Sequence, residues 1–409
     1  MSDRLVLHEY ETAPEIELTN EDLKLISTLP VGRIQVLAGS DQGRYRIRSQ
    51  SWVGTVHLSS RELRILPKVR DLENLLLMLR GAAGLADWAP RTAPFTSTSW
   101  VDGVAELVLN TIDLATRRGL LHGYRTQEER TPVLRGRLQI ATLAARPWDE
   151  WPLPCRYEEF TADIAENQVL LATVSLLRRF VMDAVLRRNV ISLTDRFAEV
   201  TTPTAPLALL DSIAPTSLNA HYQPALRLAR LVIEGLGVSH QVGDIAGASF
   251  LIDMNRLYEL WLSTELSLRL GPDLQVIEQF TTWLDVDRRI QLRPDLVIRG
   301  GRRNLLVGDV KYKLTGTGRA RNPDYYQLHA YTTALGLSQG VLIYCQADDA
   351  PPRRTVIRGH EGEKTLTCFP LPLSGTRQDV EASLNTLAVT LRGQAQVGLA
   401  TFAGRARIS

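Results

Sequence analysis

The sequence contains few lysines, few cysteines and no long apolar run. Only five of the 47 lysine and arginine residues are lysine. The cysteines Cys155, Cys345 and Cys368 are far apart and form no Cys-x-x-Cys pair, which argues against disulfides and structural zinc and predicts ordinary buried thiols. No segment approaches the roughly 18 apolar residues of a membrane span. The first residues also lack the apolar region of a signal peptide. We therefore expect a cytoplasmic protein without a membrane partner.

The bulk composition is that of a globular protein. With 409 residues, of which 44% are hydrophobic and 22% charged, the chain is long enough for two or three domains. Its formal net charge is only +2, so any nucleic-acid-binding surface must be local.

Hydrophobic periodicity divides the chain into four segments and predicts a multidomain α+β protein. The segments are a β-rich N-terminal domain (1–100), a mainly helical middle region (101–250) with one long helix over 161–188, an alternating α/β domain (251–375), and a C-terminal helix and tail (376–409).

The third segment predicts a mixed sheet flanked by helices. A helix is expected over 253–271, with Asp253 as its N-cap and Gly271 at its end. Strands are expected over 274–284, 288–300 and 303–314. A helix capped by Asn322 and a buried strand over 340–347 follow. The order is α-β-β-β-α-β.

Two strands of this segment carry acidic residues. Asp309, Lys311 and Lys313 alternate along one strand, so their side chains should share a face. Asp295 lies near the middle of the preceding strand candidate, and a Gly-Gly turn separates the two. A hairpin would bring Asp295 and Asp309 within a few ångströms of each other. Two buried carboxylates at that distance usually require a cation.

This pair suits Mg²⁺, which prefers oxygen ligands and retains waters for phosphate chemistry. The ligand types do not distinguish Mg²⁺ from Mn²⁺. A nearby lysine can orient or deprotonate a water, or stabilise a developing anion, whereas an arginine does not lose its proton. This explains a lysine at 311 in an arginine-rich chain. Lys313 is expected at most to contact phosphate.

Neighbouring residues agree with phosphate chemistry. Between Arg293 and Arg321 eight residues are basic and two are acidic, which fits contact with a phosphodiester backbone. Gln327 and Tyr331 are spaced i, i+4 on the following helix, so they share a face that could line the metal site.

These motifs resemble the PD-(D/E)xK nuclease superfamily: Pro-Asp at 294–295, Asp-Val-Lys at 309–311, and Gln-xxx-Tyr at 327–331. The sequence is most similar to the McrC family, the nuclease subunits of McrBC-type methylcytosine-dependent restriction systems. The likeness covers roughly residues 30–346. It includes the segments "VGTVHL", "ILPKV", "LLLML", "RRGLLHGY", "VLRGRL", "CRYEEFTADIAENQVL", "LRPDLVI", "VGDVKYKL" and "DYYQLHAY".

The resemblance implies a Mg²⁺-dependent endonuclease that cleaves double-stranded DNA. It implies a partner, a McrB-like AAA+ GTPase hexamer that recognises modified DNA, and whose hydrolysis the N-terminal domain stimulates by docking on the ring. The sequence has no G-x-x-x-x-G-K-[S/T] loop, so GTP hydrolysis must come from that partner. The function implied is restriction of modified, foreign DNA.

The resemblance also implies residue roles. It assigns metal binding to Asp295, Asp309 and the carbonyl of Val310. It assigns catalysis to Lys311, and it places Gln327 and Tyr331 in the lining of the site. Related nucleases often carry an acid on the helix before the sheet, so Glu259 is expected to approach the site.

Two other functions remain open. The chain could be a non-catalytic adaptor that activates the motor, or a stand-alone RecB-like nuclease. An adaptor would not cleave under any condition, and a stand-alone nuclease would cleave without a partner.

Overall fold

The chain forms two compact units in a computed structural model, and each unit is described by itself. One unit comprises Met1–Thr92 with Val238–Ser409, and the other comprises Ala93–Gly237. The residues that the structure describes are 3–29, 32–41, 43–59, 61–68, 72–85, 100–145, 148, 151–235, 249–313, 321–346, 351–359 and 362–405. None of the helices over these residues has the length and apolarity needed to cross a membrane.

The N-terminal part of the first unit is built on two small sheets, ordered β1-β6-β5-β10 and β2-β4-β3. Its elements are β1 (Asp3–His8), β2 (Ile16–Glu17), α1 (Asn20–Thr28), β3 (Ile34–Ala38), β4 (Arg44–Ser49), β5 (Trp52–His57), β6 (Arg61–Leu66), α2 (Leu72–Ala83) and β10 (Ser249–Asp253). Inward side chains such as Leu7, Ile47 and Leu63 form a shared core. The last strand, β10, follows the whole second unit in sequence and pairs antiparallel with β5.

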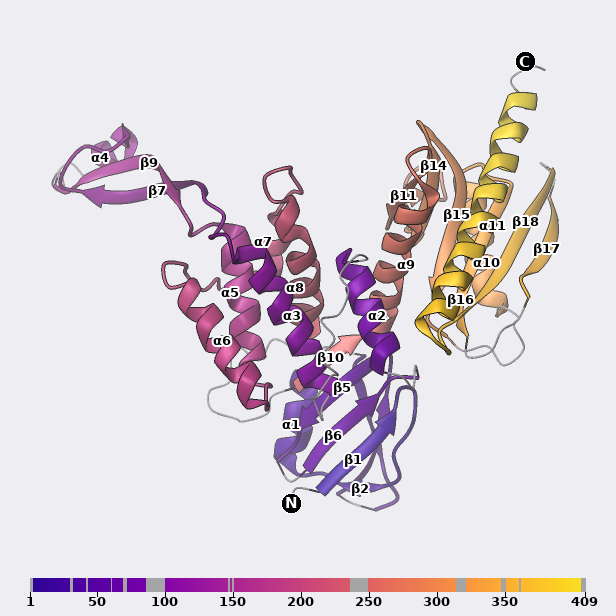
Figure 1. Cartoon of the computed structure of the whole chain (residues 1–409), viewed down its shortest axis with the longest axis horizontal. Helices are drawn as coiled ribbons and strands as arrows, with labels where there is room; N and C mark the ends of the chain where they lie inside the picture. Colours follow the sequence, from indigo (N-terminus) through magenta and orange to yellow (C-terminus); the bar gives the residue numbers. More distant parts are fainter. Residues whose placement is uncertain are drawn as a thin grey trace. The chain divides into compact units, whose positions relative to one another are not determined.

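The second unit is a helical bundle that carries a β-ribbon. Its elements are α3 (Trp100–Thr116), β7 (Gly123–Thr131), β8 (Arg137–Leu138), α4 (Ile140–Ala145), β9 (Leu153–Thr161), α5 (Ala165–Leu177), α6 (Ala184–Arg196), α7 (Pro206–Ser212), the 3₁₀ helix η1 (Ala220–Tyr222) and α8 (Gln223–Gly235). Figure 1 shows β7 and β9 as a twisted ribbon that extends away from α3, α5 and α8.

The sequence-based prediction of one long helix over 161–188 is wrong. The chain instead forms two helices: α5 ends at Leu177, and α6 begins after Asp183. Asp183 caps α6 by accepting hydrogen bonds from the N–H groups of Val185 and Leu186. The β7–β9 ribbon was also missed. Its strands alternate polar residues with few apolar ones, so they show little of the period-2 hydrophobic pattern.

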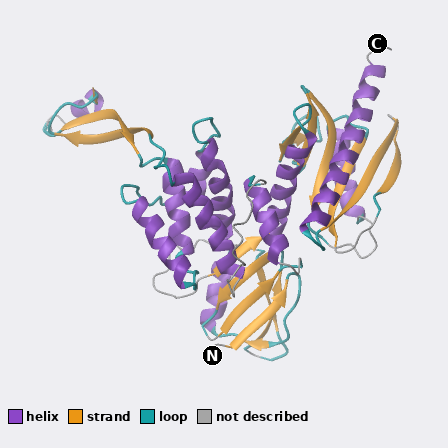
Figure 2. Ribbon diagram, in the orientation of Figure 1, coloured by secondary structure: helices purple, strands orange, loops and turns teal. Residues whose placement is uncertain are grey.

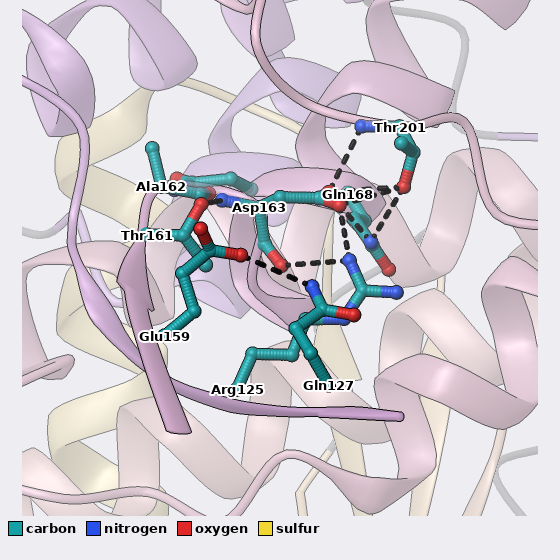
Figure 3. Close-up of polar contacts among 9 residues, drawn as sticks. Arg125, Gln127, Glu159, Thr161, Ala162, Asp163, Gln168 and Thr201 are labelled. Atoms are coloured by element: carbon teal, nitrogen blue, oxygen red, sulfur yellow. Dashed lines mark hydrogen bonds and ion pairs between the residues drawn. The ribbon is translucent and has the colours of Figure 1, made fainter. Parts of the chain in front are cut away.

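A polar cluster fixes the base of the ribbon to the bundle (Figure 3). The Asp163 carboxylate forms an ion pair with Arg125 of β7. It also accepts hydrogen bonds from Gln168 Nε2 at 2.7 Å and from Thr201 N at 2.9 Å. Burial opposes ionisation of Asp163, but these donors together lower its pKa. One carboxylate therefore connects the ribbon, α5 and the segment after α6.

The C-terminal part of the first unit is a six-stranded mixed sheet, ordered β11-β14-β15-β16-β18-β17 (Figures 1 and 2). Its elements are α9 (Met254–Leu270), β11 (Gln275–Glu278), β12 (Thr282–Trp283), β13 (Gln291–Leu292), β14 (Leu296–Gly300), β15 (Arg303–Lys311), α10 (Asn322–Ala334), β16 (Gln339–Gln346), β17 (Arg353–Gly359), β18 (Gly362–Pro372) and α11 (Arg377–Arg405). The α+β class is thus as expected.

Helices cover the two faces of this sheet. On β18, Leu366 and Cys368 pack in the cluster that includes Leu328 of α10. The residue between them, Thr367, accepts a hydrogen bond from Gln394 of α11 at 2.7 Å. Because neighbouring strand residues point to opposite faces, α10 and α11 lie on opposite sides of the sheet. Odd-numbered residues of β15 such as Val307 face α10.

The predicted element order is present, with three corrections. The strand candidates 274–284 and 288–300 each break in two, and the outer halves form a separate hairpin, β12–β13. The breaks fall at Gln279, whose φ is +48°, and around Pro294, which lacks an N–H for strand pairing. Helix α10 is preceded by Arg321 as its N-cap, so Asn322 is its first residue rather than its cap.

Asp253 and Gly271 flank α9 as predicted, and Asp253 accepts a hydrogen bond from Asn255 N. The hairpin of β17 and β18 was not predicted. The three cysteines are buried, as expected.

A single methyl group added at Gly308 should destabilise the sheet. Its Cβ would lie 2.5 Å from Leu296 Cδ1 and 3.0 Å from Val341 Cγ1, so the Gly308→Ala variant overpacks the core at a cost of about 1–3 kcal/mol. Thermal unfolding followed by circular dichroism measures this. The matched control is Gly393→Ala on α11, where no atom lies within 4 Å of the new Cβ. That change should stabilise by up to about 1 kcal/mol. Equal melting temperatures for the two variants would contradict this packing.

Candidate active site

The hairpin of β14 and β15 brings two carboxylates together. Its register places Leu296 opposite Gly308, so the adjacent residues Asp295 and Asp309 meet at the end of the pair. Asp295 lies just before β14 rather than in the middle of a strand, which corrects the sequence-based placement. Asp295 Oδ2 accepts a hydrogen bond from Val310 N at 2.8 Å. The backbone of β15 thus fixes the carboxylate of the neighbouring strand.

Lys311 connects this pair to helix α10. Its Nζ lies 2.6 Å from Asp309 Oδ2 and 3.0 Å from Gln327 Oε1. Gln327 in turn donates a hydrogen bond from Nε2 to the Tyr331 hydroxyl at 2.9 Å. The structure therefore joins Asp309, Lys311, Gln327 and Tyr331 in one continuous polar chain, on the sheet face that α10 covers.

Gln279, which was not predicted as a site residue, bridges Asp295 to helix α9. Gln279 Nε2 lies 3.3 Å from Asp295 Oδ1 and 3.4 Å from Glu259 Oε2. Glu259 thus approaches the site through Gln279, while also pairing with Arg256 at 3.6 Å. Gln279 was missed because its surroundings resembled one uninterrupted strand. Its backbone is left-handed, with a φ of +48°, and the strand ends there.

The site holds more negative charge than its lysine balances. Burial and the neighbouring Asp295 carboxylate raise the pKa of Asp309 to about 8, although Lys311 opposes the rise. Burial and Asp295 also raise the pKa of Glu259 to about 7. Burial would lower the pKa of Lys311, but Asp309 outweighs it and the net shift is upward. The ammonium form of Lys311 is therefore favoured.

The donor set fits a hard divalent cation. Asp309 is 1% exposed, and apart from the lysine ion pair its Oδ2 receives no hydrogen bond from the described residues. A second carboxylate stands beside it, and both offer oxygen, the atom that Mg²⁺ prefers. Over the described part of the chain no group of three or more His, Cys, Asp or Glu side chains gathers as a metal-ligand set. Any ion held here would therefore retain water ligands, as Mg²⁺ commonly does.

Lys313 does not join this site. Strand β15 ends at Lys311, and Lys313 Nζ instead lies 3.5 Å from Asp324 Oδ1 in the first turn of α10. Asp324 is buried and also accepts a hydrogen bond from the Tyr344 hydroxyl. Lys313 thus helps to hold the N-terminus of the helix that carries Gln327.

The residue after Lys311 faces the opposite side of the sheet and contacts the N-terminal strands. The Tyr312 hydroxyl donates a hydrogen bond to Glu9 Oε1 at 2.8 Å, and Lys68 N donates to the same oxygen at 2.6 Å. Burial raises the pKa of Glu9 to about 7. The Tyr312 ring lies 5.6 Å from that of Tyr258, on α9.

The sequence matches a family of known proteins. The family model for the McrBC 5-methylcytosine restriction system component matches residues 47–345, which is more than half of the chain. The chain belongs to this McrBC component family. The sequence-based resemblance is thereby confirmed at the level of the family. No curated protein matches the chain.

Two solved structures match this McrBC component to different degrees. A chain of the refined half-complex from a tetradecameric assembly of Thermococcus gammatolerans McrB AAA+ hexamers with bound McrC has a TM-score of 0.52 at 16% identity, over 94% of this chain and 99% of that chain. At this identity the likeness concerns the fold. The cryo-EM structure of the Thermococcus gammatolerans McrBC complex has a TM-score of 0.39 at 17% identity, over 66% of this chain and 89% of that chain. That score is too low to support a shared fold.

We expect the stability of the metal-free protein to fall as the pH rises from about 4 to about 8. The raised pKa values of Asp309 and Glu259 mean that the folded state retains protons which the unfolded state has released. The loss should be about 2 kcal/mol or more. Differential scanning fluorimetry across this range, with EDTA, measures it.

Adding Mg²⁺ should reverse the loss at the alkaline end, by about 2.7 kcal/mol at a concentration 100 times its Kd. Asp309→Asn serves as the control: it should reduce the pH dependence to the part that Glu259 and Glu9 contribute, and remove the response to Mg²⁺. An equal response to Mg²⁺ in this variant would exclude Asp309 from metal binding.

Proposed function

We propose that the chain is the Mg²⁺-dependent DNA endonuclease subunit of a modification-dependent restriction complex. The observation that carries the proposal is the contact between Asp295, Asp309 and Lys311 on adjacent strands, with Gln327 holding the lysine. Two acids and one amine at this spacing suit phosphodiester hydrolysis. The α9-β11-β14-β15-α10-β16 order supports assignment of this part to the PD-(D/E)xK superfamily.

In this proposal Asp295 and Asp309 hold the cation, together with the carbonyl of Val310. When bound, Mg²⁺ supplies Lewis-acid activation of water and neutralises charge on a phosphoryl oxygen. Lys311 acts as an ammonium, because its pKa is raised. It orients the attacking water and stabilises the negative charge that develops on the phosphate.

Three further residues position Lys311 or take part in proton transfer. Gln327 accepts a hydrogen bond from Lys311 and so aims the ammonium along the sheet face. Tyr331 accepts a hydrogen bond from Gln327, and burial with the two nearby aspartates raises its pKa, so it remains a neutral phenol. Glu259, with a pKa of about 7, is suited to accept a proton at neutral pH.

We further propose a McrB-like AAA+ GTPase hexamer as the partner and double-stranded DNA as the substrate. The support is membership of the McrBC family and the likeness to a McrB–McrC assembly. The chain itself has no phosphate-binding loop of the P-loop type. The N-terminal domain is the proposed docking part, and stimulation of the partner's GTP hydrolysis is its proposed effect.

Exchanging Lys311 for arginine should abolish cleavage although the positive charge is kept. A planar guanidinium cannot replace a compact ammonium within 2.6 Å of Asp309 and 3.0 Å of Gln327. We expect cleavage of modified duplex DNA, with partner, GTP and Mg²⁺, to fall at least about 100-fold in Lys311→Arg and in Asp309→Asn. Gel analysis of the products measures this.

Lys364→Arg is the matched control, because Lys364 Nζ contacts Thr333 Oγ1 on the surface rather than an acid of the site. It should cleave like the unmodified protein. All three variants should still bind the partner and stimulate its GTPase. Absence of cleavage by the unmodified complex would favour the adaptor function. Cleavage without any partner would favour a stand-alone nuclease.

A further inference from the structure

A short hairpin leaves the sheet directly beside the paired carboxylates. Strand β12 follows Gln279 and strand β13 precedes Asp295, and the two ends of the hairpin are joined by backbone hydrogen bonds. Gln279 N donates to Asp295 O at 2.9 Å, and Phe280 N donates to Pro294 O at 3.1 Å. The backbone of the hairpin is thus continuous with the residues that hold the site.

The base of this hairpin is anchored and its turn is well defined. Phe280 and Leu292 pack against the core cluster beneath α10. At the turn, Leu284 N donates to Ile290 O at 2.9 Å, and the Asp285 carboxylate accepts from Ile290 N at 2.7 Å and Arg289 N at 2.9 Å. These backbone donors lower the pKa of Asp285, so its charge is maintained. The hairpin is therefore an ordered arm, and its base, called the root below, is fixed to the core.

The tip of the arm combines exposed aliphatic and cationic side chains. Val286 is 100% exposed, Ile290 52% and Leu284 41%. Arg288 and Arg289 are exposed at the turn, and Arg293 is exposed at the root. Aliphatic residues concentrated at a protruding tip mark a contact surface more often than scattered ones do. Asp285 and Asp287 offset part of the positive charge, and Asp287 pairs with Arg289 at 3.3 Å. With three arginines against two aspartates the hairpin keeps a net charge of +1, which favours an anionic partner.

We propose that the β12–β13 hairpin is a DNA-contacting arm of the nuclease site. Arg288, Arg289 and Arg293 bind phosphates next to the scissile bond, and the aliphatic tip enters a groove and contacts the bases. Apolar side chains flanked by arginines are used in this way by proteins that widen or kink a duplex. The inference rests on the proposed function. It names the part of the chain that holds the DNA at the proposed nuclease site.

Duplex DNA fits this surface better than a protein partner does. The arm is rooted at the residues proposed to hydrolyse a phosphodiester, so a substrate in the site passes within reach of the arm. A cationic rim around an apolar tip matches phosphates around stacked bases.

The test measures binding of the full-length chain to a short fluorescent duplex by anisotropy, in an Asp309→Asn background that prevents cleavage. Val286→Asp should weaken binding about tenfold. The double variant Arg288→Ala with Arg289→Ala should weaken it by a similar factor. It should also reduce the slope of log Kd against log salt by about 2, because two phosphate contacts are lost.

Strand β17, at the edge of the six-stranded sheet, provides matched controls. Val356 is 54% exposed, and Arg354 and Arg358 are exposed beside it. Arg358 pairs with Glu363 at 4.0 Å, much as Arg289 pairs with Asp287 at 3.3 Å. Val356→Asp and the double variant Arg354→Ala with Arg358→Ala should leave Kd and salt slope within about twofold of the background.

Several results would overturn the arm's assignment. They are equal weakening by the hairpin and control variants, no weakening by the hairpin variants, or no duplex binding by the background protein. Loss of GTPase stimulation with DNA binding intact would assign the hairpin to the partner and likewise reject the proposal. In contrast, hairpin-dependent DNA binding without cleavage by the complex with Asp309 restored would reject the nuclease and leave the arm supported.

Discussion

The site depends on one electrostatic constraint, which is that two aspartates meet at the end of β14 and β15 with a single lysine between them and α10. One ammonium does not balance two carboxylates in a buried setting. Burial first, and then the Asp295 carboxylate, raise the pKa of Asp309 despite Lys311. The neighbouring groups partly stabilise this negative charge. Val310 N binds one carboxylate, Lys311 binds the other, and Gln327 orients the lysine. In the proposed function a divalent cation supplies the remaining compensation.

The surrounding fold keeps this arrangement in register. Gly308 allows close approach of β14 to β15, and alternation along β15 sends Asp309 and Lys311 to the face that α10 covers. The opposite face receives Tyr312, which bonds to Glu9 of the N-terminal strands. Helix α9 contributes Glu259 to the site and begins directly after β10, a strand of the N-terminal sheet. The candidate site and the N-terminal sheet are therefore connected through α9 and through the Tyr312–Glu9 hydrogen bond.

Sequence reasoning located the site because its chemistry is local. The Asp-x-Lys spacing, the Gly-Gly turn and the i, i+4 pair on α10 are each short-range patterns, so Asp295, Asp309, Lys311, Gln327 and Tyr331 could be expected to meet. Their catalytic roles stay predictions. Features set by distant contacts or by unusual backbone were missed. Gln279 enters through a positive φ, the β7–β9 ribbon has a polar pattern, and Glu9 meets Tyr312 303 positions away in sequence.

The late position of β10 has a consequence for biosynthesis. This strand completes the N-terminal sheet by pairing with β5, yet it is separated from β5 by the entire second unit. A nascent chain must therefore leave one edge of that sheet open while the bundle and its ribbon are translated and fold. Asp295, Asp309 and Lys311 follow β10 in the sequence. The candidate site is thus completed late in synthesis, after every strand of the N-terminal sheet has been translated.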